Sequence, residues 1–132
     1  IDPGLVALME WGRSTITPVQ LVEAFDYCHS ANVTLVEQFH ETPFLLTPTV
    51  AGQTPLSGGQ GTIDGEPDVN WVRYTYPFNL TRSPAGTVNA GFTADGMPVG
   101  LQVVGAQNAD VSVLRLIAFL EDHLAIDTIP VL

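Results

Sequence analysis

Apolar residues recur at three- and four-residue spacing over two long stretches of the chain, and this spacing predicts an amphipathic helix in each stretch. We expect the first helix over about 18–40. It begins with a capping signal, because Thr17 suits the N-cap, Pro18 the first helical position, and Gln20 the third position of a capping box. Its stripe is almost continuously apolar and consists of Leu21, Phe25, Cys28, Asn32, Leu35 and Phe39.

The second long helix starts at Asn108 or Asp110 and runs to about Leu124. We expect it to bury one stripe, made of Val113, Leu114, Ile117, Leu120 and Leu124. A shorter helix from Gly4 to Trp11 precedes the first long helix, and Gly12 is expected to end it.

Short apolar runs between the helices predict strands. Residues 44–47 form a buried strand that stops at Pro48, and residues 85–92 and 98–104 flank an Asp95-Gly96 pair that suits a hairpin turn. The five glycines and two prolines of 50–68 predict a loop of about 20 residues. Asp68 is expected to cap a short helix that ends before Pro77. The order predicts an α/β fold with about three strands, including a β-hairpin, and three to four helices.

Composition narrows the class of protein. Hydrophobic residues make up 45% of the 132 residues and charged residues 14%, which excludes a disordered tail. The mean hydropathy of +0.24 indicates apolar faces that pack against protein outside this chain, or that drive homo-oligomerisation. A net charge of −10 disfavours nucleic-acid binding, and no apolar run is long enough to span a membrane.

Two features bear on location. The single Cys28 cannot form an intramolecular disulfide, which suits a reducing, cytoplasmic setting. The chain starts at Ile1 with neither an initiator Met nor a secretory leader, so we expect a processing boundary there.

Three motifs carry a resemblance to a known family. Leu46-Thr47-Pro48-Thr49, then Phe78-Asn79-Leu80-Thr81, then Gly91-Phe92 with Asp95-Gly96-Met97-Pro98-Val99-Gly100-Leu101-Gln102 occur in this order over about 44–121. In sequence and spacing they are similar to the C-terminal region of the amidase-signature family. There are two departures: Arg82 stands where the family usually has glycine, and Asn89 where it commonly has proline.

The resemblance implies hydrolysis of a carboxamide to a carboxylate and ammonia or an amine. In that family a serine nucleophile is activated by a second serine and a lysine base, and these groups belong to the upstream part of the family's chain. The four basic residues of this sequence are all arginines, namely Arg13, Arg73, Arg82 and Arg115. Because there is no lysine, this sequence cannot assemble that triad. We therefore expect residues 1–132 to be the C-terminal segment of one amidase domain, inactive without its upstream catalytic portion.

Other catalytic or metal-binding interpretations have less support in the sequence than the amidase resemblance. Ser57 lies in a Gly-rich run without the paired serines of the family signature, so we expect a plain loop and assign no catalytic residue. His29 and His40 fall on roughly one face of the predicted helix, but no second pair of ligands accompanies them. No metal site or cofactor is predicted.

By the resemblance, two segments line the substrate side of the family's cleft. Matched residue by residue, they assign substrate binding to Thr47, Pro48, Thr49, Tyr74, Phe78 and Asn79. The alternative is that the aromatic residues are core and that Asn79 bonds nearby backbone. Gln102 is expected to be structural.

Three functions remain open at this point. The chain is part of an amidase acting on a small-molecule amide, with the N-terminal part of the same chain as its partner. Alternatively, it is a free-standing binding module, or part of an amidotransferase A-type subunit.

Overall fold

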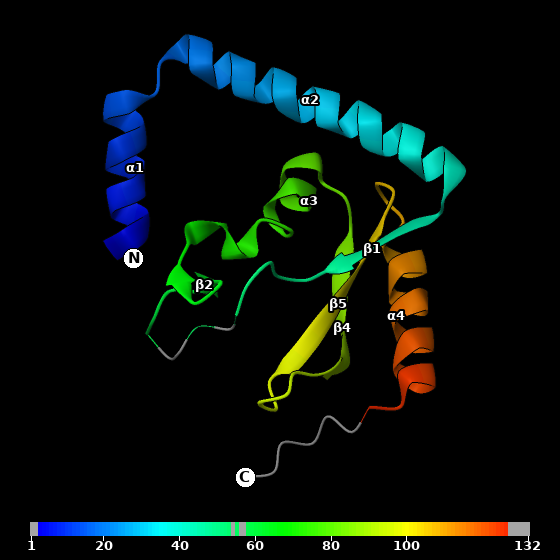
Figure 1. The fold of residues 1–132 in the computed structure, drawn as a ribbon. Coiled ribbons are helices and arrows are strands. Elements are labelled where there is room, and N and C mark those ends of the chain that lie inside the picture. Colours follow the sequence, from blue (N-terminus) through cyan, green and yellow to red (C-terminus); the bar gives the residue numbers. More distant parts are fainter. Residues whose placement is uncertain (1–2, 54, 56–57, 127–132) are drawn as a thin grey trace.

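The computed structural model describes residues 3–53, 55 and 58–126. Two helices, α1 (Pro3–Thr15) and α2 (Pro18–Glu41), form an L-shaped outer arm, and the strands with the remaining helices form the body (Figure 1). We call residues 3–41 the arm. Ser57 falls outside the described residues, so its predicted loop is not tested.

Helix α2 confirms the predicted start in detail. The Thr17 side chain accepts a hydrogen bond from the backbone N–H of Gln20, and the Gln20 side chain accepts one from the backbone N–H of Thr17. This reciprocal pair satisfies two donors that a helix N-terminus leaves without intrahelical partners. The predicted end of α1 at Gly12 is wrong. The helix continues to Thr15, and the backbone N–H of Ile16 still bonds the Gly12 carbonyl at 2.9 Å.

The main sheet has three antiparallel strands in the order β1-β5-β4. Their bounds are Phe44–Pro48 for β1, Ala85–Phe92 for β4 and Pro98–Gly105 for β5. The predicted hairpin is confirmed, with an irregularity in register between Asn89 and Phe92. The Asn89 side chain accepts a hydrogen bond from the N–H of Gly91 within this bulge, so the local geometry differs here from a regular ladder.

The sequence did not predict the hairpin of β2 (Thr62–Ile63) and β3 (Glu66–Pro67) inside the expected loop. Asp64 and Gly65 form its turn with φ of 54° and 86°, the pattern of a tight hairpin turn. A Cβ on buried Gly61 would collide with the Trp71 ring, so this segment packs closely on the next element.

Asp68 caps a short 3-10 helix, η1 (Val69–Val72), as predicted, by accepting a hydrogen bond from the N–H of Asn70. The prediction of a single short helix that ends before Pro77 is incomplete, because a second helix, α3 (Tyr76–Thr81), starts at Tyr76. Proline at the start of a helix costs nothing, since its missing N–H would lack an intrahelical partner anyway. Arg82 caps α3 with φ 56° and ψ 30°, a left-handed conformation that favours glycine.

The core lies between the sheet and α4 (Asp110–Leu124), where Val88, Val103 and Val113 are buried. Helix α4 covers one sheet face, and the η1–α3 segment lies over the other (Figure 1). The predicted stripes are buried only in part. Leu114 on α4 is 65% exposed and Phe25 on α2 is 65% exposed, and the strand predicted as buried leaves Leu46 at 55%.

Candidate functional site

Side chains that face away from α4 carry the polar groups of the sheet. Thr47, Gln102 and Thr87 lie directly opposite one another across β1, β5 and β4. Because residues paired across antiparallel strands share a face, they form one row, which we call the polar row. Gly86, on the other face, packs against Ile117 of α4, so the polar row faces away from that helix.

Gln102 joins the two segments that the sequence nominated. Its side-chain amide donates to Thr47 Oγ1 and to the Tyr74 carbonyl oxygen, both at 2.9 Å, and the residue is only 4% exposed. The predicted structural role is confirmed: one of the two acceptors is a side chain and the other is a backbone carbonyl. The end of β1 and the segment before α3 are thus held at one place, although Thr47 and Tyr74 are 27 positions apart along the chain.

Thr49 extends the polar row at the end of β1. Its hydroxyl lies 3.1 Å from the Thr87 hydroxyl, and its N–H donates to the Gly100 carbonyl. A Cβ at position 100 would collide with the Thr49 side chain, so glycine there makes room for this contact. Pro48, in contrast, pairs with Leu101 and belongs to the α4 side of the sheet. The structure therefore separates Pro48 from Thr47 and Thr49.

The aromatic and amide candidates occupy the η1–α3 segment. Tyr74 and Phe78 are half-buried, and the guanidinium carbon of Arg73 lies 5.6 Å from the Tyr74 ring centre. Asn79 is exposed, and its side-chain amide donates to the Thr75 carbonyl at 3.3 Å. This intrahelical bond is the alternative that the sequence left open for Asn79.

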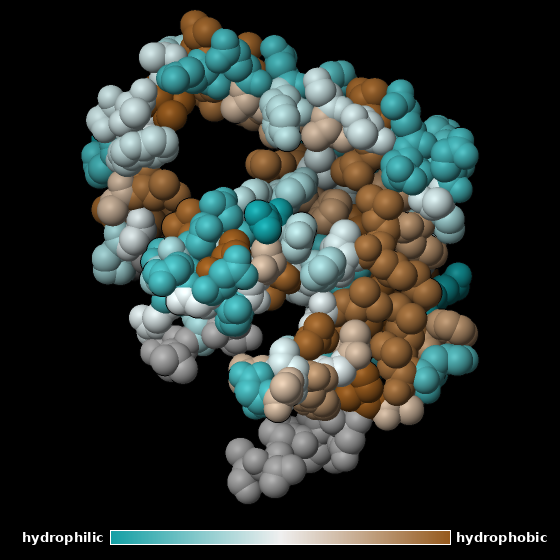
Figure 2. Space-filling view, in the orientation of Figure 1, coloured by the Kyte–Doolittle hydropathy of each residue, from teal (hydrophilic) through white to brown (hydrophobic). Residues whose placement is uncertain are grey.

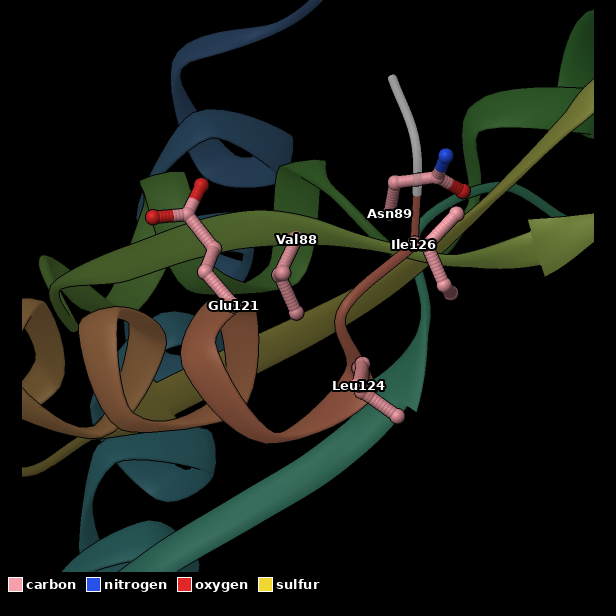
Figure 3. A pocket seen from close by; sticks show the side chains of 5 residues that line it. All are labelled: Val88, Asn89, Glu121, Leu124 and Ile126. Carbon is pink, nitrogen blue, oxygen red and sulfur yellow. The ribbon is translucent and has the colours of Figure 1, made fainter.

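A hollow in the described part of the chain lies elsewhere. Figure 3 shows it between β4 and the end of α4, with a volume of about 120 Å³. Its lining residues are Val88, Asn89, Glu121, Leu124 and Ile126. None of the six candidate residues lines this hollow, whereas hydrogen-bonding groups converge on the polar row.

Three further findings concern the described residues as a whole and the β4–β5 turn. No cluster of three or more His, Cys, Asp or Glu able to hold a metal ion occurs among residues 3–53, 55 and 58–126. Within the same ranges, no helix is both long and apolar enough to cross a membrane. The pKa of Asp95, in the β4–β5 turn, lies below its usual range because the Thr93 hydroxyl and then its own backbone N–H bond the carboxylate.

A family model described as Amidase matches residues 17–114. The chain belongs to the amidase family. An acylamidase of Rhodococcus erythropolis is 45% identical over 83 residues, which cover 58% of this chain and 17% of that protein. A fatty acid amide hydrolase of Medicago truncatula is 32% identical over 90 residues, covering 65% of this chain and 15% of the relative.

Solved amidase structures extend the likeness over nearly the whole chain. A bacterial aryl acylamidase superposes with a TM-score of 0.72 and 28% identity, covering 92% of this chain and 26% of that chain. Another structure, named only as an amidase, has the same TM-score at 25% identity and covers 93% and 29%. The chain thus spans less than a fifth of those two curated relatives and less than a third of the two solved chains.

Proposed function

We propose that this chain is the C-terminal portion of an amidase that hydrolyses a carboxamide to a carboxylate and ammonia or an amine. The observation that carries the proposal is the bridge from Gln102 to Thr47 and Tyr74. It brings two segments nominated by the family resemblance to one face of the sheet. Their hydroxyl groups are suited to hydrogen-bond an amide substrate.

The chain's share of the reaction is to supply sheet strands and one wall of the substrate pocket. Hydrolysis needs an activated hydroxyl that attacks the amide carbon, after which the C–N bond breaks and water releases the acyl group. The 132 residues contain no lysine to act as the base of the family's serine–serine–lysine set. In this proposal the nucleophile and base come from the upstream part of the same amidase chain.

Three further points belong to the proposal. The hydrolase names of the relatives support hydrolysis over an amidotransferase role or a non-catalytic binding module. The substrate-contacting residues are Thr47, Thr49 and Tyr74, with Phe78 beside them. A reducing, cytoplasmic location is supported by the single, half-buried Cys28, which has no cysteine partner in the chain.

Ammonia release over a panel of aliphatic and aryl amides tests the proposal. The purified chain alone is expected to show no turnover. Mixed with the upstream portion of the Rhodococcus erythropolis acylamidase, it is expected to restore turnover. Activity of the chain alone, retained after removal of contaminants, would contradict the proposal and direct attention to Ser57 and the histidines.

A substitution of Thr47 tests whether this residue belongs to the pocket wall. Thr47→Val in the restored enzyme should raise KM several-fold, roughly as expected for one lost hydrogen bond, with a smaller change in kcat. Thr34→Val on the exposed face of α2 is the matched control and should change neither constant. Equal kinetics for the two variants would remove Thr47 from the pocket.

A further inference from the structure

The outer face of α2 carries an apolar stripe with no covering element among the described residues. Three- and four-residue spacing places its members on one side of the helix. They are Val22, Phe25, His29, Val33, Val36 and His40, which we call the outer stripe. Its four apolar side chains are 45–65% exposed. On its inner side, the arm is separated from part of the body by open space (Figure 2).

The contacts of α2 with the body use a different face. Asn32 is half-buried, and its side-chain oxygen accepts a hydrogen bond from Gln107 Nε2 at 3.0 Å. Cys28, Leu35 and Phe39 are half-buried with it at helical spacing. The outer stripe lies beside this contact face, so docking there would leave the observed packing of α2 unchanged.

Acidic side chains line the margin of the outer stripe that lies away from the contact face. All four carboxylates of α2 share this margin by their spacing: Glu23, Asp26, Glu37 and Glu41. Helix α2 contains no arginine or lysine. An occupant of the outer stripe must therefore combine an apolar surface with basic side chains along one edge.

A second copy of this chain fits that requirement poorly. Each copy carries a net charge of −10, and a paired arm would set the same carboxylates against one another. The arm is also part of the likeness to much longer amidases. Superposition on two of them covers 92–93% of this chain and only 26–29% of theirs, so most of α1 and α2 is included. The remaining polypeptide of such an enzyme is the occupant that these observations favour.

We propose that the outer stripe of α2 is the docking face for the upstream part of the amidase polypeptide, which contacts it through an apolar surface edged by arginine or lysine. This inference rests on the proposed function, because it names the partner that completes the enzyme. Helix α1 also carries exposed apolar side chains. Leu8, Met9 and Trp11 on α1 are 55–60% exposed.

Binding of the purified chain to the upstream portion of the Rhodococcus erythropolis acylamidase tests the inference. Phe25→Asp should weaken the affinity by about tenfold or more, since it places a charge on the most exposed apolar side chain of the outer stripe. Tyr27→Asp is the matched control. Tyr27 is also an exposed aromatic residue of α2, but it lies about 200° further around the helix and should tolerate the change.

Substitutions that reverse charge provide the second part of the test. The double substitution Asp26→Lys with Glu37→Lys should weaken binding, and added salt should weaken binding of the unaltered chain more than that of the double variant. Far-UV circular dichroism confirms that each variant and the upstream portion are folded. No binding by the unaltered chain, or equal loss with Phe25→Asp and Tyr27→Asp, would overturn the inference.

Ammonia release, measured on the same mixtures, separates this inference from the proposed function. Binding that depends on Phe25 without any turnover would leave the docking face standing and reject the enzymatic proposal. Turnover that is insensitive to Phe25→Asp would reject the docking face and leave the enzymatic proposal standing. Self-association of the chain alone, abolished by Phe25→Asp, would identify a second copy as the occupant and would also overturn the inference.

Discussion

The side-chain amide of Gln102 lies 2.9 Å from the carbonyl oxygen of Tyr74, and this bond ties the middle strand of the sheet to the segment that precedes α3. The same nitrogen also donates to Thr47 Oγ1. One buried amide therefore holds both halves of the candidate pocket wall. A buried donor with two satisfied acceptors is expensive to remove, because each acceptor would then lack a partner.

Replacing Gln102 by leucine should lower the free energy of unfolding by about 2 kcal/mol, since leucine keeps much of the volume but donates no hydrogen bond. Thr47→Val, which removes one of the two acceptors, should cost about 1 kcal/mol. Urea unfolding measures both. Gln38→Leu on the exposed surface of α2 is the control, with an expected change below about 0.5 kcal/mol, and a loss there equal to that of Gln102→Leu would contradict the role of the bridge.

Gly61 packs against the Trp71 ring, so Gly61→Ala should destabilise the β2–β3 region by about 1–3 kcal/mol through overpacking. Gly12 offers the opposite case, because a Cβ there meets nothing within 4 Å and the residue lies inside α1. Gly12→Ala should raise helix stability by about 0.5–1 kcal/mol. Thermal unfolding followed by circular dichroism and tryptophan fluorescence compares the two, and a gain from both substitutions would rule out the close contact at Gly61.

Arg82→Gly should raise the free energy of unfolding by about 0.5–1 kcal/mol, because residue 82 has a left-handed backbone that an L side chain disfavours. The matched change is Arg73→Gly, where φ is −59°, so glycine relieves no left-handed backbone and adds its entropy cost to the loss of the contact with the Tyr74 ring. The midpoint of urea unfolding measures both changes in the free energy of unfolding, provided that its dependence on urea concentration is the same in each variant. A gain at residue 73 as large as that at residue 82 would show that loss of the arginine, and not relief of the backbone, is responsible.

The β4–β5 turn should resist acid down to a pH below the usual pKa of aspartate. The folded-state pKa of Asp95 is lowered, so the stabilisation by its carboxylate is present above the unfolded value of about 3.9 and is lost as the pH falls through the folded value. An NMR titration of the Asp95 carboxyl measures that pKa directly. Thr93→Val should move it upward, whereas Thr62→Val in the other hairpin should leave it unchanged.

Local signals in the sequence determined the elements whose causes are also local. The capping box at Thr17 starts α2, the Asp-Gly pair lies in the β4–β5 turn, and Asp68 caps η1. Each of these rests on residues only a few positions apart, so it is readable without the fold. The three amidase motifs likewise identified the family before any geometry was known, and the glycine expected at residue 82 corresponds to a left-handed backbone there.

Tertiary structure decided what depends on distant partners. The β2–β3 hairpin carries a local Asp64-Gly65 turn signal, but its packing depends on distant partners, because Gly61 lies against Trp71 and Gln53 pairs with Thr62. Burial of an amphipathic stripe likewise depends on what faces it, so Leu114 and Phe25 are exposed although their spacing predicts burial. The candidate wall formed for the same reason. Thr47 and Tyr74 meet only because strand register places Gln102 between them, whereas the alternation of side chains along β1 turns Pro48 to the opposite face.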